Sequence, residues 1–343
     1  MNLNLLTEED VAQLRSLISE SERVVVCAHK SPDGDALGSS LAWAGYLSQL
    51  GKAVNIVMPD AWPDFLQWLP NSHTIVRYDK HPERVEQLIA EADLVCCLDM
   101  NSSDRVLAME PVLLNATGRR LLIDHHLNPT LSAQQTISFP ELSSTCEIVF
   151  RLLWQLDAFE TMDKNMATCL YCGMMTDTGS FTYNSARPEI YEIIGLLLTK
   201  KINKDRIYRR IYNTLSHWAL RLQGYVLYRK MNIMAEGRAS YFSLTADEMH
   251  RVHFIKGDAE GLVNEPLRIK GMRLSISLRE DDRTENLIWV SLRSVDDFPC
   301  NKMAEEYFNG GGHLNASGGR LFCTIDEAEN ITRKAIEAYA DRL

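Results

Sequence analysis

The stretch RVVVCAH, residues 23–29, is a continuous apolar run that ends in a polar residue, which is typical of a strand buried in a parallel sheet. The polar segment KSPDGD (30–35) follows, and a helical pattern then runs from about Gly38 to Leu50. Further strand patterns lie at 53–59, 74–78, 93–99 and 120–126, with a helical pattern at about 82–91. Strands that alternate with helices form right-handed parallel units. The first 140 residues therefore predict a parallel α/β domain.

The rest of the chain predicts a helical region and then a second lobe. Helical patterns occupy about 144–156, 163–175 and 188–200, and the segment 203–232 is charged and helical in period. Strand patterns at 240–244, 272–279 and 287–293 come next, with helices near 302–308 and 325–342. We expect a parallel-sheet α/β lobe over 1–195, a helical connector over 196–232, and a smaller mixed α/β lobe over 233–343.

Composition and charge narrow the class of protein. The 343 residues are 45% hydrophobic and 24% charged, as in ordinary globular proteins, and the formal net charge is −10. An acidic chain argues against a long nucleic acid as a stable partner, which needs a broad basic surface. No apolar run is long enough for a membrane helix, and the N-terminus lacks the features of a signal peptide. We expect a cytoplasmic protein without a membrane partner, and a homodimer is left open.

Acidic and histidine side chains follow the predicted elements of the first lobe. Parallel strands place their carboxyl ends at one edge of the sheet, where ligands bind, so these side chains should converge. They are His29, Asp33 and Asp35 after the first strand, Asp99 after the strand at 93–99, Asp124, His125 and His126 after the strand at 120–126, and Asp177 after the helix at 163–175.

This collection of side chains favours divalent cations. Aspartates and histidines without thiolates favour Mn²⁺ above other metals, and the spacing His29-x3-Asp33-x-Asp35 lets one loop serve two neighbouring ions. Two such ions are a common device for phosphoester hydrolysis. Each element alone has a plainer interpretation, as a helix cap, a turn or a chance His-His pair. Their joint occurrence at predicted strand and helix ends makes chance a poor explanation.

Four of these segments and one glycine-rich segment resemble a known family. HKSPDGDALGS (29–39), the strand end at Asp99, DHH (124–126) and GMMTDTGSF (173–181) resemble the four motifs of the DHH phosphoesterase superfamily. GGGHLNASGG (310–319) resembles the signature of the DHH-associated C-terminal domain. Their combination is similar to the bacterial oligoribonuclease and pAp-phosphatase type. The segment 200–260 carries no motif of that family.

The resemblance implies roles for individual residues of the first lobe. One metal would be held by His29, Asp33 and Asp99, and the second by Asp35, Asp99, His125 and Asp177, so that Asp99 bridges. The resemblance makes Asp124 a residue that orients the histidines. His126 would face the substrate phosphate and act, with Asp99, in catalysis.

The second lobe would then bind the substrate, and the active site would lie in the cleft between the lobes. Arg293 resembles the family arginine that binds a substrate phosphate, and Arg105 is a weaker candidate for the same task. The glycines at 310–312 allow close approach to a ligand, and His313 could donate to a phosphate or stack on a base. A surface strand residue and a tight turn are the plainer interpretations of Arg293 and of the glycines.

The function that the resemblance implies is a manganese-dependent phosphoesterase with two divalent cations per chain. Its substrates would be short oligoribonucleotides and linear dinucleotides, with pAp as a further candidate, and a metal-activated water would attack phosphorus. Two alternatives stay open: a cyclic-di-AMP phosphodiesterase, and a non-catalytic nucleotide-binding regulator on the same scaffold. The leaving-group acid and the direction of attack on an oligomer also stay open.

Overall fold

The computed structural model describes residues 3–214, 216–255, 258–259 and 261–343. It divides into two compact units, Met1–Thr214 and Leu215–Leu343, which are described one at a time. In the part of the chain that the structure describes, no helix combines the length and the apolar character needed to cross a membrane.

The first unit is built on a six-stranded sheet with the order β3-β2-β1-β4-β5-β6, in which every pair of neighbouring strands is parallel. The predicted parallel α/β lobe is therefore confirmed. The strands are β1 (Arg23–Cys27), β2 (Ala53–Met58), β3 (Val76–Arg77), β4 (Leu94–Leu98), β5 (Arg119–Asp124) and β6 (Gln135–Ser138).

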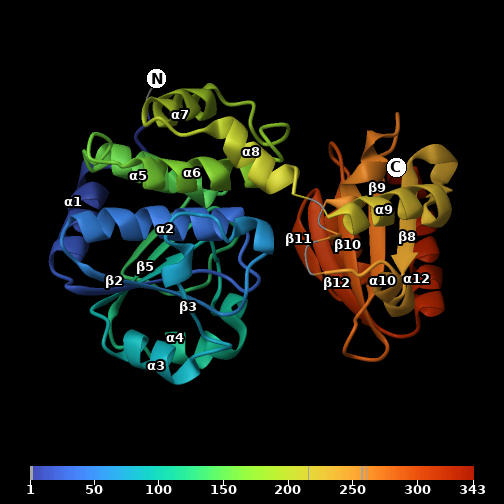
Figure 1. The fold of residues 1–343 in the computed structure, drawn as a ribbon, viewed down its shortest axis with the longest axis horizontal. Coiled ribbons are helices and arrows are strands. Elements are labelled where there is room, and N and C mark those ends of the chain that lie inside the picture. The colour runs from blue at the N-terminus through green and yellow to red at the C-terminus, as the bar shows by residue number, and fades with distance from the viewer. Residues whose placement is uncertain (1–2, 215, 256–257, 260) are drawn as a thin grey trace. The chain divides into compact units, whose positions relative to one another are not determined.

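Helices cover both faces of this sheet (Figure 1). Side chains of alternate strand residues, such as Val24 and Val26, pack with α1, α2 and the later helices, while Val25 and Cys27 pack with α3 and α4. A parallel sheet must be covered on both faces, which explains why these strands are apolar throughout. The helices are α1 (Glu8–Ser19), α2 (Gly34–Gln49), α3 (Pro82–Ala90), α4 (Glu110–Leu114), α5 (Thr145–Gln155), α6 (Lys164–Asp177), α7 (Pro188–Thr199) and α8 (Lys204–Tyr212).

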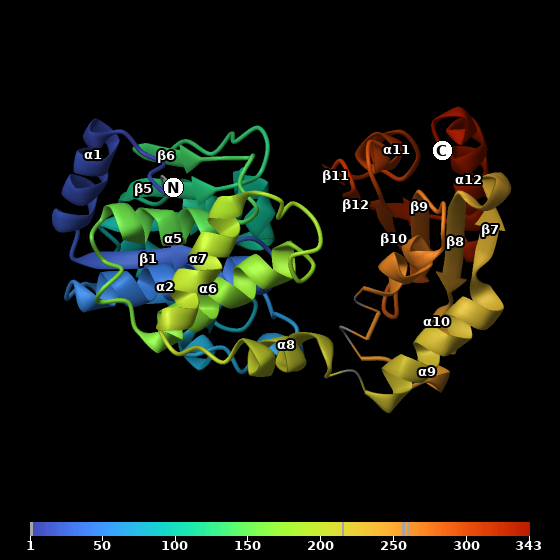
Figure 2. The ribbon, with the colours of Figure 1, turned by 90° about the horizontal axis from the view of Figure 1, so that it is seen from above.

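The second unit has a mixed six-stranded sheet with the order β11-β12-β10-β9-β8-β7. Only β8 and β9 pair in parallel, so the predicted mixed α/β lobe is also confirmed. The strands are β7 (Asn232–Met234), β8 (Ala239–Leu244), β9 (Leu274–Glu280), β10 (Leu287–Ser294), β11 (Gly311–His313) and β12 (Ala316–Phe322). Figure 2 shows α11 (Cys300–Tyr307) and α12 (Ile325–Ala338) on one side of the sheet, and α9 (His217–Tyr225) and α10 (Ala246–Arg251) on the other.

Three details differ from the sequence-based expectations. The helix after β1 begins at Gly34 rather than near Gly38, because Asp33 caps it. The charged segment 203–232 is not one helix, since α8 belongs to the first unit and α9 to the second. The glycine-rich segment, where the sequence predicts no strand, forms strand β11 and a hairpin with β12. Ile207 and Ile211 of α8 belong to the core of the first unit.

Candidate metal centre

The loop after β1 is shaped by its own helix cap. Asp33 is the N-cap of α2, and its Oδ1 accepts hydrogen bonds from the backbone N–H groups of Asp35 and Ala36, both at 3.0 Å. The second oxygen of Asp33, Oδ2, lies 3.8 Å from His29 Nε2. One carboxylate therefore serves as a cap through one oxygen and faces the histidine through the other.

Asp35 lies in the first turn of α2 and is 1% exposed. Its carboxylate accepts hydrogen bonds from the backbone N–H groups of Thr145 at 2.6 Å and Cys146 at 2.8 Å. These donors belong to the first turn of α5, where the helix dipole favours a negative charge. The N-terminus of one helix thus fixes a carboxylate that another helix presents.

Two glycines, Gly34 of α2 and Gly173 of α6, allow α6 to pack closely against α2 and α5. A Cβ on Gly34 would lie 2.3 Å from Thr176 Oγ1, and a Cβ on Gly173 would lie 2.2 Å from Cys146 Sγ and 3.0 Å from Asp35 Oδ1. The contact of α2 with α6 also brings Asp177, the last residue of α6, to the same edge as Asp35.

Asp99 follows β4 in a left-handed conformation, with φ 58°. Asp tolerates this region better than most residues. Its two oxygens face different neighbours: Oδ2 lies 3.4 Å from His29 Nε2, and Oδ1 lies 3.6 Å from His125 Nε2. The hydroxyl of Thr145 donates to Oδ1 at 3.0 Å. Asp99 therefore lies between the loop after β1 and the histidines after β5.

The potential ligand atoms form three overlapping groups, within each of which all atoms lie within 4.8 Å of one another. Asp99 occurs in two groups and so does His125. The groups are His29, Asp33 and Asp99; Asp35, His125 and Asp177; and Asp99, His125 and His126. All six residues that the sequence predicted as metal ligands thus lie together at one edge of the sheet.

The charges of this cluster are poorly balanced without a cation. Burial, with the charges of Asp99 and Asp177, raises the pKa of Asp35 well above its usual range. Burial, with the charges of Asp33 and Asp99, does the same to the pKa of Asp177. Buried carboxylates that resist ionisation together are a donor set suited to divalent cations, because a cation would remove the repulsion. The residues present therefore fit a pair of such ions.

His29 and Asp99 stabilise each other's charged forms. Burial alone would lower the pKa of His29, but the hydrogen bond to Asp99 and the charges of Asp33 and Asp99 outweigh it and raise the pKa to about 9. Burial opposes ionisation of Asp99 too, yet His29, His126 and His125 hold the pKa of that carboxyl well below its usual range. In the absence of metal, His29 and Asp99 are therefore a buried ion pair.

The His126 ring lies between the Asp124 carboxylate and the Arg105 guanidinium. Its Nδ1 is 2.8 Å from Asp124 Oδ1, and its Nε2 is 3.3 Å from Arg105 Nη2. An imidazole that donates from Nδ1 to Asp124 presents Nε2 as the acceptor for Arg105. Asp124 is fully buried. The structure thus brings Asp124 and Arg105, which the sequence proposed separately, into contact with the same ring.

The predicted substrate residues of the second unit share one face of its sheet. Pairing of the strands aligns His313 of β11 with Ala316 of β12, and Ala316 with Arg293 of β10. The Arg293 guanidinium donates to the Leu292 carbonyl at 2.9 Å. His313 is exposed. Only a small side chain therefore separates the arginine from the histidine across the sheet.

The three glycines at 310–312 differ in whether the fold has space for a side chain. A Cβ on Gly310 would lie 1.9 Å from the Gly318 carbonyl oxygen, and Gly312 has φ 143° and would place a Cβ 2.6 Å from the Ala316 oxygen. Both are required by the hairpin itself. A Cβ on Gly311 would meet only the Glu305 side chain, at 3.9 Å. Of the three glycines, Gly311 is therefore the one at which a Cβ would have no close neighbour, and ligand binding there stays a prediction.

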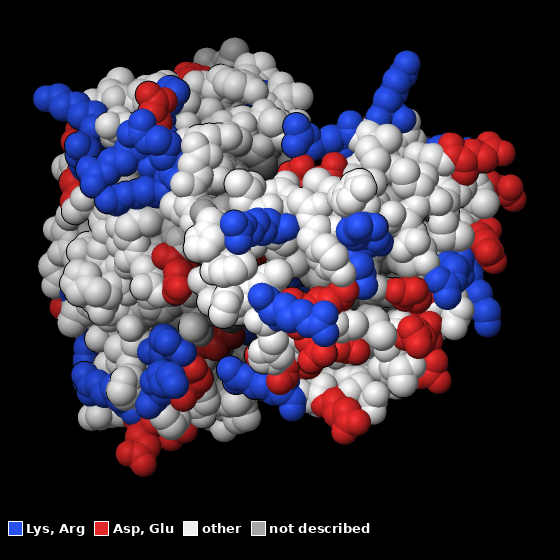
Figure 3. Space-filling model, turned by 45° about the vertical axis from the view of Figure 1, so that its right-hand side comes forward, with Lys and Arg blue, Asp and Glu red and all other residues white. Residues whose placement is uncertain are grey.

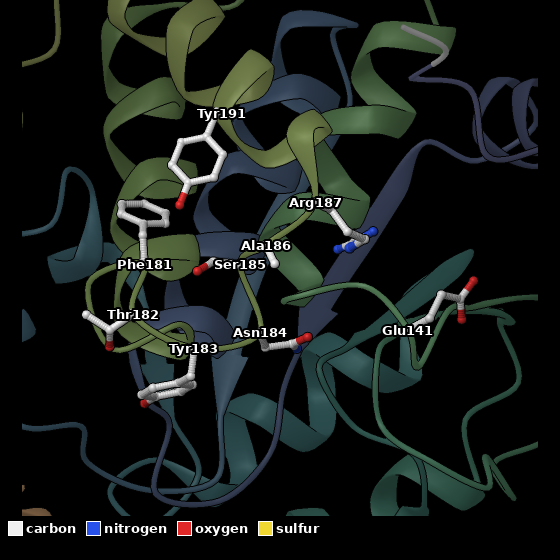
Figure 4. Close-up of a pocket in the computed structure, with 9 residues that line it drawn as sticks. All are labelled: Glu141, Phe181, Thr182, Tyr183, Asn184, Ser185, Ala186, Arg187 and Tyr191. Atoms are coloured by element: carbon white, nitrogen blue, oxygen red, sulfur yellow. The ribbon is translucent and has the colours of Figure 1, made fainter. Parts of the chain in front are cut away.

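A pocket of about 460 Å³ beside the metal centre was missed by the sequence reasoning (Figure 4). Its walls continue from residues of the centre: Thr178 follows Asp177 and begins the turn to Arg187, while Glu141 precedes Leu142, whose carbonyl lies 3.4 Å from His125 Nδ1. The rings of Phe181 and Tyr191 lie on one side of the pocket and the side chains of Arg187 and Glu141 on the other. The pocket is lined by Glu141, Phe181, Thr182, Tyr183, Asn184, Ser185, Ala186, Arg187 and Tyr191.

Comparison with known proteins decides the family. The family model described as "DHH family, N-terminal domain" matches residues 23–174. A solved structure of an exopolyphosphatase-related protein from Bacteroides fragilis is 46% identical, with 98% of both chains covered and a TM-score of 0.95. The chain belongs to the DHH family of phosphoesterases. The predicted resemblance is confirmed.

Two kinds of curated relatives with named activities are similar to this DHH protein. The bifunctional oligoribonuclease and PAP phosphatase NrnA of Thermus thermophilus is 28% identical over 93% of this chain and 90% of its own length. The cyclic-di-AMP phosphodiesterase GdpP of Geobacillus thermodenitrificans is 26% identical over 95% of this chain. The chain spans about half of the length of GdpP, since 49% of that protein is covered.

Proposed function

We propose that this DHH protein is a manganese-dependent phosphoesterase that hydrolyses short oligoribonucleotides, linear dinucleotides and pAp in the cytoplasm. The single observation that carries the proposal is the position of Asp99, whose two carboxylate oxygens face His29 and His125. The similarity to NrnA over nine-tenths of that protein's length supports the choice of substrate.

The proposed cation sites follow from the three groups of ligand atoms. His29, Asp33 and Asp99 would hold one cation, and Asp35, Asp99, His125 and Asp177 the other. When bound, two such ions lower the pKa of a water and offset negative charge on a phosphoryl group. Oxygen-rich ligands with imidazole favour Mn²⁺.

The protein's own groups then act on the phosphoryl oxygens. Arg105 and His126, which lie 3.3 Å apart, would donate hydrogen bonds to them. To donate from Nε2, His126 must take up a second proton there, and Asp124 would stabilise the imidazolium that results. Asp124 therefore serves as a positioning residue, and His126 and Arg105 would be catalytic residues.

Nucleotide recognition is assigned to both units. The pocket at Phe181–Arg187 is large enough for a nucleobase and has aromatic rings on one side and Arg187 on the other. In the second unit, Arg293 and His313 would bind a phosphate or a base, with Gly311 leaving room for it. Hydrolysis of dinucleotides would then require residues of both units.

The experiment that tests this function is a substrate panel with the purified chain and Mn²⁺. It compares pApA, pGpG, short RNA ladders, pAp, cyclic di-AMP and pyrophosphate. Turnover of pApA and short RNA with little turnover of cyclic di-AMP supports the proposal. Preference for cyclic di-AMP favours the second candidate, which the similarity to GdpP suggests. Binding without turnover of any substrate would identify a regulator and contradict the enzyme.

A further inference from the structure

The face of the second unit's sheet that α9 and α10 partly cover carries three successive rows of side chains. Strand pairing aligns them across β12, β10 and β9. The first row is Ala316, Arg293 and Ser275, with His313 of β11 beside Ala316. The second is Gly318, Ser291 and Ser277, with Gly311 beside Gly318. The third is Arg320, Trp289 and Arg279.

The third row aligns Trp289 with an arginine on each of the two neighbouring strands. Trp289 is 40% exposed, although Ile288 and Val290 beside it on the strand are buried in the core. Arg320 and Arg279 are its direct partners on the two neighbouring strands. The Arg320 guanidinium lies 6.0 Å from the Phe322 ring centroid. An exposed indole in register with two arginines offers a surface on which a base can stack, with cationic groups on both neighbouring strands.

The indole is held in place from one side. Trp289 Nε1 donates to Asp281 Oδ1 at 2.8 Å, and Asp281 also accepts from the backbone N–H groups of Thr284 at 2.9 Å and Arg283 at 3.2 Å. The acid nearest to the ring is therefore already engaged by three donors. Arg279 is also stacked, with its guanidinium 5.6 Å from the Phe254 ring centroid.

The second row, between Arg293 and Trp289, carries only small side chains on β12 and β10. Gly318 and Ser291 have small side chains, so nothing large rises from β12 or β10 between Arg293 and Trp289. Rows of a strand face repeat every two residues, or about 6.8 Å, so Arg293 and Trp289 lie about 14 Å apart. The turn Leu262–Arg268 contacts β9 and β10 on this face, whereas a Cβ on Gly318 of β12 would meet only the Val290 oxygen, at 3.4 Å. A ligand that continues from Arg293 toward Trp289 would therefore pass over Gly318 of β12.

We propose that this face is an extended binding track for a single-stranded oligonucleotide, with Arg293 at its proximal end and Trp289, Arg279 and Arg320 as a distal station for a nucleotide beyond the dinucleotide. The proposal rests on the proposed function and adds a preference for substrate length. A positively charged, partly aromatic face complements the phosphates and bases of the chain that it would bind. Figure 3 shows that basic and acidic groups are interspersed on the face of the molecule drawn there. An oligonucleotide would therefore be bound by a local set of residues rather than by the overall charge of the protein.

The test compares substrates of two lengths. We would measure kcat/KM of the full chain with Mn²⁺ for pApA and for unlabelled pentaadenylate, with product release followed by chromatography. Trp289→Ala should lower kcat/KM for pentaadenylate about 5-fold or more, the loss expected for one stacked base. The value for pApA should change less than 2-fold. Trp289→Phe, which keeps an aromatic face, should restore most of the loss.

A matched control and a binding measurement complete the design. Tyr228 is 81% exposed and has Arg229 5.0 Å from its ring centroid, but it lies outside the sheet. Tyr228→Ala should leave both substrates unaffected. The affinity for pentaadenylate, measured calorimetrically without metal, should fall in Trp289→Ala by a similar factor.

Three results would overturn the track. They are an unchanged kcat/KM for pentaadenylate in Trp289→Ala, equal losses on both substrates, and loss of affinity in Tyr228→Ala as large as in Trp289→Ala. If wild-type protein hydrolysed neither substrate, the proposed function would fail, and the calorimetric comparison alone would decide the track.

Discussion

Asp99 Oδ1 lies 3.6 Å from His125 Nε2, while the second oxygen of the same carboxylate points to another histidine, 3.4 Å away. A carboxylate divided in this way can serve two cations at once. The hydroxyl of Thr145, which donates to Oδ1, fixes its orientation. The account of the centre therefore depends on Asp99 more than on any other residue.

Asp99→Ala should abolish hydrolysis, with a loss of at least about 10³-fold in kcat/KM, because it removes a ligand from both proposed cations. Metal analysis should find fewer than two Mn²⁺ per chain. Asp104→Asn, an exposed carboxylate five residues away, serves as the control and should keep its activity. An active Asp99→Ala protein with two bound ions would contradict the bridge.

His126→Ala should lower kcat by about 10²-fold and change KM little, because the charge that it offsets develops in the transition state. Asp124→Asn should show a smaller loss of the same kind, since it leaves the ring in place and removes only the negative charge beside Nδ1. A change confined to KM in His126→Ala would make this histidine a ground-state binder.

The metal-free protein should lose stability as the pH rises. His29 has a pKa of about 9 in the folded protein against an ordinary value of 6.5. Its contribution is therefore present in full below pH 6.5 and is lost by pH 9, which amounts to about 3 kcal/mol. The raised pKa values of Asp35 and Asp177 act in the same direction, since ionising them is unfavourable in the folded state.

Urea unfolding of the chelator-treated protein at several pH values between 6.5 and 9 measures how steeply the free energy of unfolding falls with pH. Mn²⁺ should raise Tm more at high pH, because it binds the deprotonated ligands. His29→Gln should flatten the slope of the metal-free protein. A wild-type free energy of unfolding that does not vary over this range would refute the paired state of His29.

Gly173→Ala should destabilise the first unit by about 1–3 kcal/mol, because the new Cβ would lie 2.2 Å from Cys146 Sγ and the helices must separate. Asp35 should shift as well, so Mn²⁺ affinity should fall. Gly195→Ala on α7, where a Cβ meets nothing within 4 Å, should be neutral or stabilising. Thermal melts with and without Mn²⁺ separate the two effects.

Arg293→Ala and His313→Ala should raise KM for dinucleotides about 10-fold or more, the loss expected for a charge-assisted hydrogen bond. Their rates on bis-p-nitrophenyl phosphate should be nearly unchanged, because an aryl ester needs little beyond the metals. Truncation after Thr214, which keeps α8 and its core residues Ile207 and Ile211, should reproduce this selectivity. Equal losses on both substrates would mean that the second unit supports the fold only.

Much of the fold is predictable because the buried strands are apolar on both faces. RVVVC and LVCCL are recognisable from composition alone, and their order along the chain implies parallel pairing. Strand β6, QTIS, escapes this reasoning because it is short and half polar at an edge of the sheet. Strand β7, NIM, has three residues and no strong pattern.

The metal centre is predictable for a related reason. His29, Asp99 and His125 each follow a strand, so their convergence requires only the rule that parallel strands end at one edge. The pocket at Phe181–Arg187 gives no such signal, because its shape depends on a turn with φ values of 53°, 61° and 63° at Gly179, Ser180 and Phe181. Local sequence carries no pattern for a turn of that kind.

The most direct test of the central claim is a crystal structure of the protein grown with Mn²⁺, with anomalous data collected at the manganese absorption edge. The account predicts two anomalous peaks about 3.5–4 Å apart, one beside His29 and Asp33 and one beside Asp35 and Asp177, with one oxygen of Asp99 between them or one on each. A single peak, or two peaks of which Asp99 contacts only one, would contradict it.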